Sequence, residues 1–132
     1  MFKAAFSGFS VNNLEKAKEF YTNTLGLQIT HETMGDGEDM GLTLKLPNNS
    51  GKVFAYPKED HVPAAFTVLN FVVENIDEAV AQLTTKGVTF EHYEGMPHDD
   101  KWIVRGLLNN MGPDIAWFKD PAGNILSVLQ EK

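Results

Sequence analysis

The chain has 132 residues, of which 42% are hydrophobic and 22% charged, and it contains no cysteine, which is typical of one globular domain without disulfides or cysteine-bound zinc. Its formal net charge of −7 argues against nucleic acid and anionic membrane surfaces as partners, because like charges repel. No apolar run approaches the roughly 20 residues that span a bilayer, and we find no signal-peptide pattern, so a cytoplasmic location is expected.

The first half of the chain predicts a strand, a helix and then further strands. An extended apolar stretch ends at Val11, and Asn12 or Asn13 can cap a helix because a short side-chain oxygen accepts from the free N–H groups of the first turn. The apolar residues of this helix fall on one stripe, formed by Leu14, Ala17, Tyr21 and Leu25. Alternating or apolar runs then predict strands at Leu42–Leu46 and Lys52–Tyr56.

The second half predicts the same order of elements. Residues 58–66 are polar and proline-flanked, so we interpret them as a linker between a first module, residues 1–57, and a second module, residues 67–132. Asn75 can cap a helix whose apolar stripe is formed by Ile76, Ala79, Val80 and Leu83. Runs typical of strands follow near Val88–His92, Ile103–Leu107, Ile115–Lys119 and Ile125–Gln130.

The two halves also repeat each other in sequence. The pattern Phe9-x-Val11-x-Asn13-Leu14-x-x-Ala17 recurs 62 positions later as Phe71-x-Val73-x-Asn75-Ile76-x-x-Ala79, and Gly26 has a counterpart in Gly87. Two matches in the same order indicate an internal duplication. The sequence therefore predicts an α+β fold made of two tandem βαβββ modules.

Two segments resemble a known family. Residues 9–21 (FSVNNLEKAKEFY), followed by Leu25-Gly26-Leu27, and residues 117–126 (WFKDPAGNIL) are similar to the opening and the terminal hairpin of modules in the vicinal oxygen chelate superfamily, the glyoxalase/bleomycin resistance protein/dioxygenase group. The resemblance implies that both modules build a curved mixed sheet around a cavity. It also implies a small-molecule ligand and a homodimer.

Metal-using members of that superfamily carry His, Glu or Gln on the first and last strands of each module. Carried over by register, these positions fall on Phe6, Val68, Phe54 and Ser127. Phenylalanine and valine cannot bind a metal ion, and serine is a poor ligand alone. The histidines His31, His61 and His92 share no spacing typical of a metal site either. We therefore expect no metal and no cofactor.

The polar segment from Glu94 to Trp102 contains the remaining histidine, His98. One interpretation is a lid over the cavity, in which Trp102 covers an apolar surface and His98, Asp99 or Asp100 acts as acid, base or hydrogen-bond partner. The other interpretation is a solvated hairpin loop without a function. The sequence leaves both open.

We therefore expect a binding protein that holds a small apolar or aromatic compound in the sheet cavity without a metal, as bleomycin-resistance-type members do. Its predicted ligand-binding residues are Phe6, Phe54, Tyr56, Val68, Trp102, Trp117 and Ser127. One alternative is a glyoxalase-like metal-dependent lyase or isomerase, or a dioxygenase, which would need a Lewis acid. Another is metal-free acid–base catalysis by His98 with Asp99 or Asp100.

Overall fold

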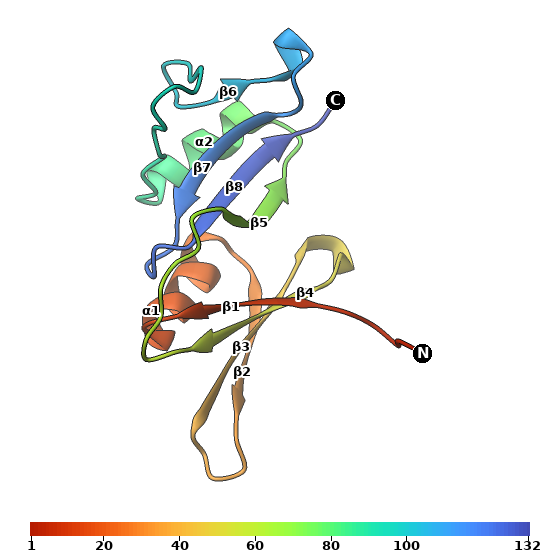
Figure 1. The fold of residues 1–132 in the computed structure, drawn as a ribbon, viewed down its shortest axis with the longest axis vertical. Helices are drawn as coiled ribbons and strands as arrows, with labels where there is room; N and C mark the ends of the chain where they lie inside the picture. Colours follow the sequence, from red (N-terminus) through yellow and green to blue (C-terminus); the bar gives the residue numbers. More distant parts are fainter. The chain divides into compact units, whose positions relative to one another are not determined.

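The computed structural model describes all 132 residues and divides into two compact units, Met1–Pro63 and Ala64–Lys132. The boundary between the units falls within the expected linker, residues 58–66. Each unit contains one four-stranded mixed sheet with helical segments (Figure 1). The two units are described separately below.

The first unit follows the order β1, α1, β2, β3, β4. Its elements are β1 (Ser7–Val11), α1 (Leu14–Glu19) with a π-helical continuation (Phe20–Thr24), β2 (Gln28–Thr33), β3 (Asp39–Lys45), a short 3-10 turn (Pro47–Asn49) and β4 (Lys52–Pro57). The strand order in the sheet is β1-β4-β3-β2. Strands β1 and β4 are parallel, and the other pairs are antiparallel.

One face of this first sheet forms the core together with α1. The Asn13 side chain accepts a hydrogen bond from the Lys16 N–H at 3.0 Å and so begins the helix. The helix then presents its apolar stripe to the sheet. The buried apolar residues of the helical segment and the strands are Leu14, Ala17, Tyr21, Phe9, Val11, Leu42, Leu44, Val53 and Ala55.

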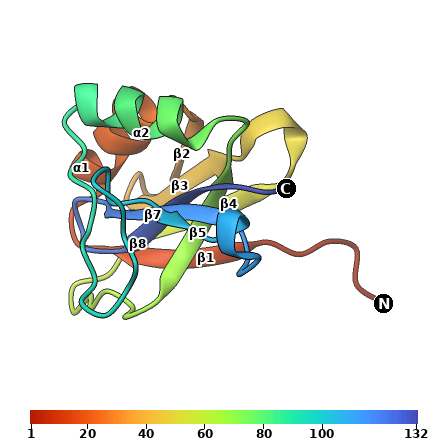
Figure 2. The same ribbon diagram turned by 90° about the horizontal axis from the view of Figure 1, so that it is seen from above.

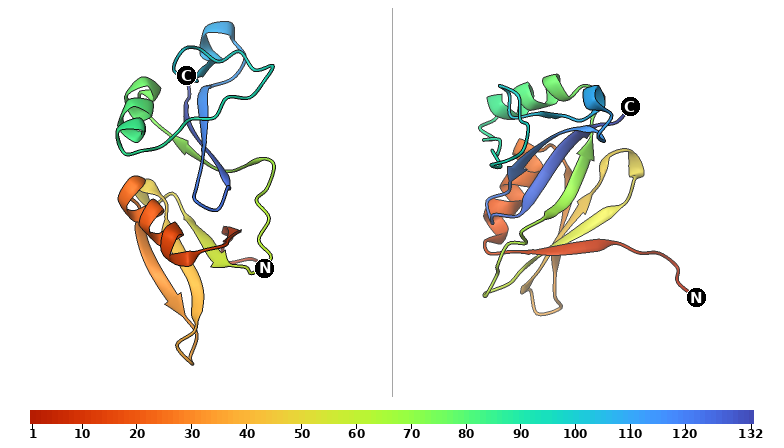
Figure 3. Two further views of the ribbon diagram at one scale, coloured as in Figure 1. Left: turned by 90° about the vertical axis from the view of Figure 1, so that its left-hand side faces the viewer. Right: turned by 45° about the horizontal axis from the view of Figure 1, so that its top comes forward.

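The second unit repeats this arrangement. Its elements are β5 (Thr67–Val72), α2 (Ile76–Thr85), β6 (Val104–Arg105), a 3-10 turn (Leu107–Asn109), β7 (Asp114–Lys119) and β8 (Ile125–Gln130). The sheet order is β5-β8-β7-β6, with β5 and β8 parallel. Helix α2 covers one face of this sheet, as Figure 2 and the left view of Figure 3 show. Its buried residues Ile76 and Val80 lie on the side of the core residues Phe90, Ala116, Phe118, Leu126 and Val128.

The duplication is visible at the ends of both helical segments. Asn75 accepts from the Glu78 N–H at 3.1 Å, as Asn13 does in the first unit. Gly26 and Gly87 both follow a helical segment with positive φ, 71° and 94°, which glycine adopts without steric cost. The predicted α+β fold of two βαβββ repeats is confirmed, since three strands follow the helix in each unit.

The strands before β7 differ from the prediction. Residues Val88–His92 do not form a regular strand: Phe90 makes one isolated bridge to Phe118, and the Glu91 N–H donates to the Trp117 carbonyl at 2.8 Å. The predicted strand Ile103–Leu107 shortens to Val104–Arg105. Both corrections have one cause, because the long loop 91–103 leads the chain away from the edge of β7 between these contacts.

None of the helices in the structure has the length and apolar character that crossing a bilayer requires.

Candidate functional site

The sheet face opposite α1 carries the three aromatic residues predicted for the first module. Phe54 and Tyr56 alternate on β4 with the buried Val53 and Ala55, so both point to the open face. Their rings stack with centroids 6.2 Å apart. Phe6 lies just before β1, is 60% exposed, and packs its ring 4.8 Å from the Lys52 ammonium.

Gly41 makes room for this aromatic pair. A Cβ atom at Gly41 would lie 2.7 Å from the Phe54 ring and 2.6 Å from the Ala55 carbonyl, and its φ is +155°. A side chain at position 41 would therefore clash with the Phe54 ring and with the backbone of β4. The open face of the first sheet is thus an aromatic surface that the backbone of a neighbouring strand accommodates.

The open face of the second sheet is centred on Trp117. Trp117 of β7 is the cross-strand partner of Ser127 of β8, and its indole N–H donates to the Thr67 hydroxyl of β5 at 3.1 Å. Because β8 separates β7 from β5, the indole lies across β8. Ser127 is fully buried, and its hydroxyl hydrogen-bonds the Asn70 side chain at 2.5 Å. Of this cross-strand pair, Trp117 is therefore the accessible residue and Ser127 is not.

Val68, the last predicted lining residue, lies at an irregularity in β5. The register between β5 and β8 shifts between Thr67 and Leu69, so Val68 has no paired residue on β8. Its side chain is half-buried. A β-bulge of this kind changes the direction of the strand and of its side chains.

The long loop of the second unit brings two rings next to Trp117 and two more rings beside these, and we call His92, Tyr93, His98, Trp102 and Trp117 the aromatic cluster. Tyr93 and His98 lie 5.5 and 6.1 Å from Trp117, measured between ring centroids. The His92 ring lies 5.1 Å from His98 and 5.0 Å from Trp102. The sequence prediction included His98, Trp102 and Trp117 but missed the other two members.

His98 holds the loop together through both ring nitrogens. Its Nε2 accepts from the Tyr93 N–H at 3.0 Å, and its Nδ1 lies 2.8 Å from the Trp102 carbonyl. A carbonyl only accepts, so the neutral tautomer with the proton on Nδ1 satisfies both bonds. A substrate would have to displace one of these backbone partners to reach His98.

A charged network ties the same loop to the beginning of α2. Arg105 donates to Asp77 at 2.7 and 3.1 Å and to Asp99 at 2.9 Å, and Lys101 donates to Asp77 at 3.1 Å. The hydrogen bond from Arg105, followed by that from Lys101, lowers the pKa of Asp77 to about 2. Burial raises the pKa of Asp99, but hydrogen bonds from the Ile103 N–H and Arg105 outweigh burial, and the pKa is lowered. Asp100 is exposed.

The Tyr93 hydroxyl is buried and has no hydrogen-bond partner. Burial raises the pKa of Tyr93, and the neighbouring charge of Glu91 raises it further, while Lys119 has the opposite effect. The phenol therefore stays neutral near pH 7 and keeps its proton for donation. A buried donor without an acceptor is costly, which makes Tyr93 the polar group of the aromatic cluster that most needs a partner.

The residues present do not fit a divalent metal centre of the kind the resemblance implies. The four register positions carry Phe6, Phe54, Val68 and Ser127, and the Ser127 hydroxyl is already bonded to Asn70. Within either unit, no three His, Asp or Glu side chains converge in a way that could hold a metal ion.

Comparison with known proteins adds three findings. Residues 5–128 match the model of the Glyoxalase/Bleomycin resistance protein/Dioxygenase superfamily. The chain is 28% identical over 130 residues to the uncharacterized protein YraH of Bacillus subtilis (strain 168), covering 91% of each. A superfamily member from Sphaerobacter thermophilus DSM 20745 has a TM-score of 0.72 at 27% identity, with 99% of this chain and 98% of that one covered.

A further solved structure shares the fold at lower sequence identity. TnmS3, an antibiotic binding protein from Streptomyces sp. CB03234, has a TM-score of 0.68 at 21% identity, with 100% of this chain and 99% of that one covered.

Proposed function

The chain belongs to the glyoxalase/bleomycin resistance protein/dioxygenase superfamily, and from this premise we propose that it binds a small, partly aromatic compound on the aromatic faces of its sheets without a metal ion. One observation carries the proposal. The positions that would supply metal ligands carry Phe6, Phe54, Val68 and Ser127, and rings lie beside them on both open faces. A surface of this composition binds by burial and stacking rather than by coordination.

The aromatic faces favour a planar ligand. Phe54 and Tyr56 present a stacked pair, and Trp117 presents an indole held across β8 by its bond to Thr67. An indole fixed in this way loses little conformational freedom when a ligand stacks on it. Each aromatic pair adds about 0.5–1.5 kcal/mol beyond the burial of its area.

The net charge of the protein further limits the charge that a ligand can carry. The net charge of −7 raises the local concentration of cations and lowers that of anions near the protein. We therefore infer a neutral or cationic ligand. The fold similarity to TnmS3, described as an antibiotic binding protein, supports sequestration of an antibiotic-like compound as the role.

The binding experiment uses the cationic anthraquinone mitoxantrone and bleomycin as probes in isothermal titration calorimetry. For whichever probe binds the wild type, we expect Trp117→Ala or Phe54→Ala to weaken binding by at least about tenfold, because each variant removes an aromatic ring of a proposed binding face. Leu108→Ala is the control, because Leu108 is 85% exposed on the turn after β6. If neither probe binds, or if both aromatic variants bind like the wild type, the proposed aromatic faces are wrong.

Metal content tests the competing enzyme hypothesis. After dialysis, elemental analysis is expected to find far less than one equivalent of Zn, Ni, Mn or Fe per chain, because three of the four register positions lack donor atoms and the Ser127 hydroxyl is already bonded to Asn70. Retention of one equivalent would overturn the metal-free proposal. It would favour a glyoxalase-like lyase or isomerase, or a dioxygenase.

A further inference from the structure

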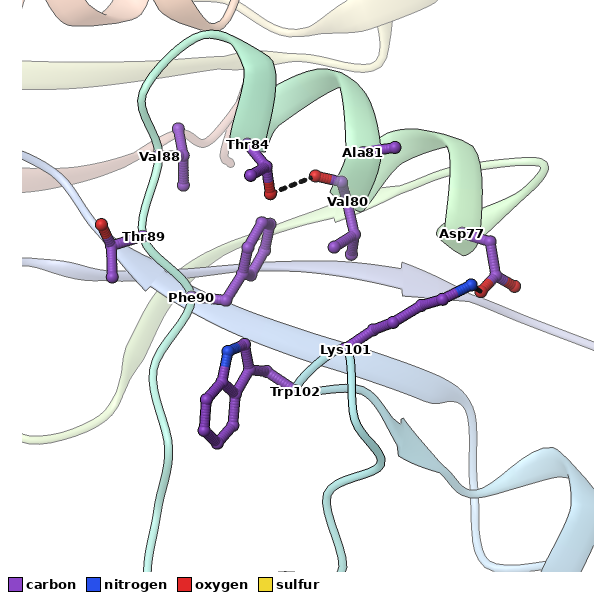
Figure 4. A pocket seen from close by; sticks show the side chains of 9 residues that line it. All are labelled: Asp77, Val80, Ala81, Thr84, Val88, Thr89, Phe90, Lys101 and Trp102. Atoms are coloured by element: carbon purple, nitrogen blue, oxygen red, sulfur yellow. Dashed lines mark hydrogen bonds and ion pairs between the residues drawn. The ribbon is translucent and has the colours of Figure 1, made fainter.

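We propose that the second unit contains another small-molecule site, in a pocket between α2 and the loop 88–102, for a planar, uncharged aromatic compound with one hydrogen-bond acceptor. The pocket has a volume of about 570 Å³, within the range of small-molecule sites. Figure 4 shows it along the side of α2, with Phe90 at its centre, Trp102 below and Lys101 reaching towards Asp77. It is independent of the open sheet faces proposed above.

The walls of the pocket are chiefly apolar. Val80, Val88 and Phe90 are buried and form its inner surface, and the small side chain of Ala81 leaves the side of α2 open. The Trp102 side chain completes the lining and is 44% exposed. A flat molecule placed here would cover the phenyl ring of Phe90 and the indole of Trp102, and so remove apolar surface from water.

The backbone holds Trp102 in this position against its own preference. Its φ is +67°, in the left-handed region that a bulky residue rarely adopts. Trp102 N–H donates to the Asp99 carbonyl at 3.1 Å, and the Asp99 carboxylate accepts from the N–H groups of Lys101 at 2.8 Å and Ile103 at 2.9 Å. Backbone conformations of this kind persist where surrounding contacts impose them, and they cluster at binding sites.

The rim of the pocket supplies a hydrogen-bond donor. Asp77 already accepts two hydrogen bonds from Arg105 and one from Lys101. An ammonium group has three N–H donors, so Lys101 can keep Asp77 and still donate to a ligand oxygen. The carboxylates of Asp77 and Asp99 disfavour an anionic ligand, and an uncharged carbonyl acceptor therefore suits this rim.

The test uses naphthalene-2-carboxamide as the probe and Trp102 fluorescence as the signal. The variant Trp117→Phe leaves Trp102 as the single tryptophan and removes the indole of the open sheet face. In this background we expect saturable quenching by the probe. Adding Ala81→Phe fills the pocket and is expected to weaken binding at least about tenfold. Gln82→Phe places the same ring on α2 outside the pocket lining and is expected to change binding less than about twofold.

The same titration followed by ¹H–¹⁵N NMR on the wild-type protein localises the probe without any substitution. Shifts of the Ala81, Thr84 and Trp102 signals support the site. Absence of saturable binding, or binding that Ala81→Phe does not weaken, overturns it. Shifts confined to Trp117, Asn70 and Ser127 also overturn it, and they would instead support the open sheet face.

Discussion

Trp102 stands out among the residues of the loop because its backbone has φ of +67° while its side chain contacts His92 and lines a pocket. The left-handed conformation costs a residue with a Cβ atom roughly 1–2 kcal/mol. Glycine avoids this cost but has more entropy to lose on folding, about 0.5–1 kcal/mol. The two effects can be separated by comparing two substitutions that both remove the indole.

We predict that Trp102→Gly is more stable than Trp102→Ala, by up to about 1 kcal/mol. Both variants lose the same ring contacts, so their difference reports the backbone. Urea unfolding followed by circular dichroism gives the two free energies of unfolding. An alanine variant as stable as the glycine variant, or more stable, would show that the loop changes conformation when the indole is absent.

The lowered pKa of Asp77 predicts that the stability of the fold depends on pH. The pKa of this carboxyl is about 2 in the folded chain against an ordinary value of 3.8, chiefly through Arg105 and then Lys101. A lowered carboxyl pKa stabilises the fold above pH 3.8, and this contribution is lost as the pH falls through 2. The Asp77 side chain is 42% exposed, so after solvent screening we expect only about 1 kcal/mol.

The matched variant is Asp77→Asn, which removes the charge and keeps the shape. We predict that the wild type is the more stable protein at pH 5, and that its advantage shrinks by roughly half at pH 3. Urea unfolding at both pH values measures the difference. An advantage that is unchanged at pH 3 would mean that Arg105 and Lys101 do not lower the pKa of Asp77 as the structure indicates.

Residue-level predictions from sequence succeeded where side-chain type and register suffice. Phe54 and Tyr56 share a face of β4 as alternation requires, and Trp102 lies beside the apolar residues of a pocket at α2. The contacts of His92 and Tyr93 could not be predicted, because they depend on how a loop of irregular conformation folds back on β7. The ion pairs of Arg105 with Asp77, 28 positions apart in sequence, were missed for the same reason.

At the level of elements, the N-cap residues of the helices are the local features that can be identified most directly from the sequence. Asn75 caps α2 through the Glu78 N–H at 3.1 Å, and α2 has ten residues. We predict that Asn75→Ala lowers the free energy of unfolding by about 1 kcal/mol. Asn75→Asp is expected to keep most of the stability that the cap contributes, because Asp is also a good N-cap residue. Thermal or urea unfolding measures both variants. An equal loss in both would show that the Asn75 amide has a role besides capping.

Helices and long strands were predictable because their periodicity is local, whereas the second-module strands before β7 were not. Phe90 has the apolar side chain of a strand residue, yet it makes only an isolated bridge to Phe118. Pairing depends on a neighbour at the right distance over several residues, and the inserted loop prevents this. The strand β6 keeps two residues for the same reason.

For the whole molecule, the resemblance to the superfamily predicts a homodimer. Two apolar side chains at β5 are exposed in the single chain: Phe66, just before the strand, is 69% exposed, and Val72, at its end, is 63% exposed. Exposed apolar surface of this kind favours association. Analytical ultracentrifugation is expected to give twice the chain mass of 14.7 kDa. A single species of 14.7 kDa at low and high micromolar concentration would contradict the prediction.

In each sheet the earliest strand pairs with the latest one, β1 with β4 and β5 with β8. The ribosome synthesises the chain from the N-terminus, so all four strands of the first sheet are available once Pro57 has emerged. The second sheet lacks β8 until synthesis reaches Gln130. Since β8 lies between β5 and β7, a premature stop codon before Ile125 would leave β5 without a partner and β7 paired only with the two residues of β6. Such a truncated product would expose the unpaired backbone N–H and C=O groups of these strands. We expect quality-control proteases to degrade it.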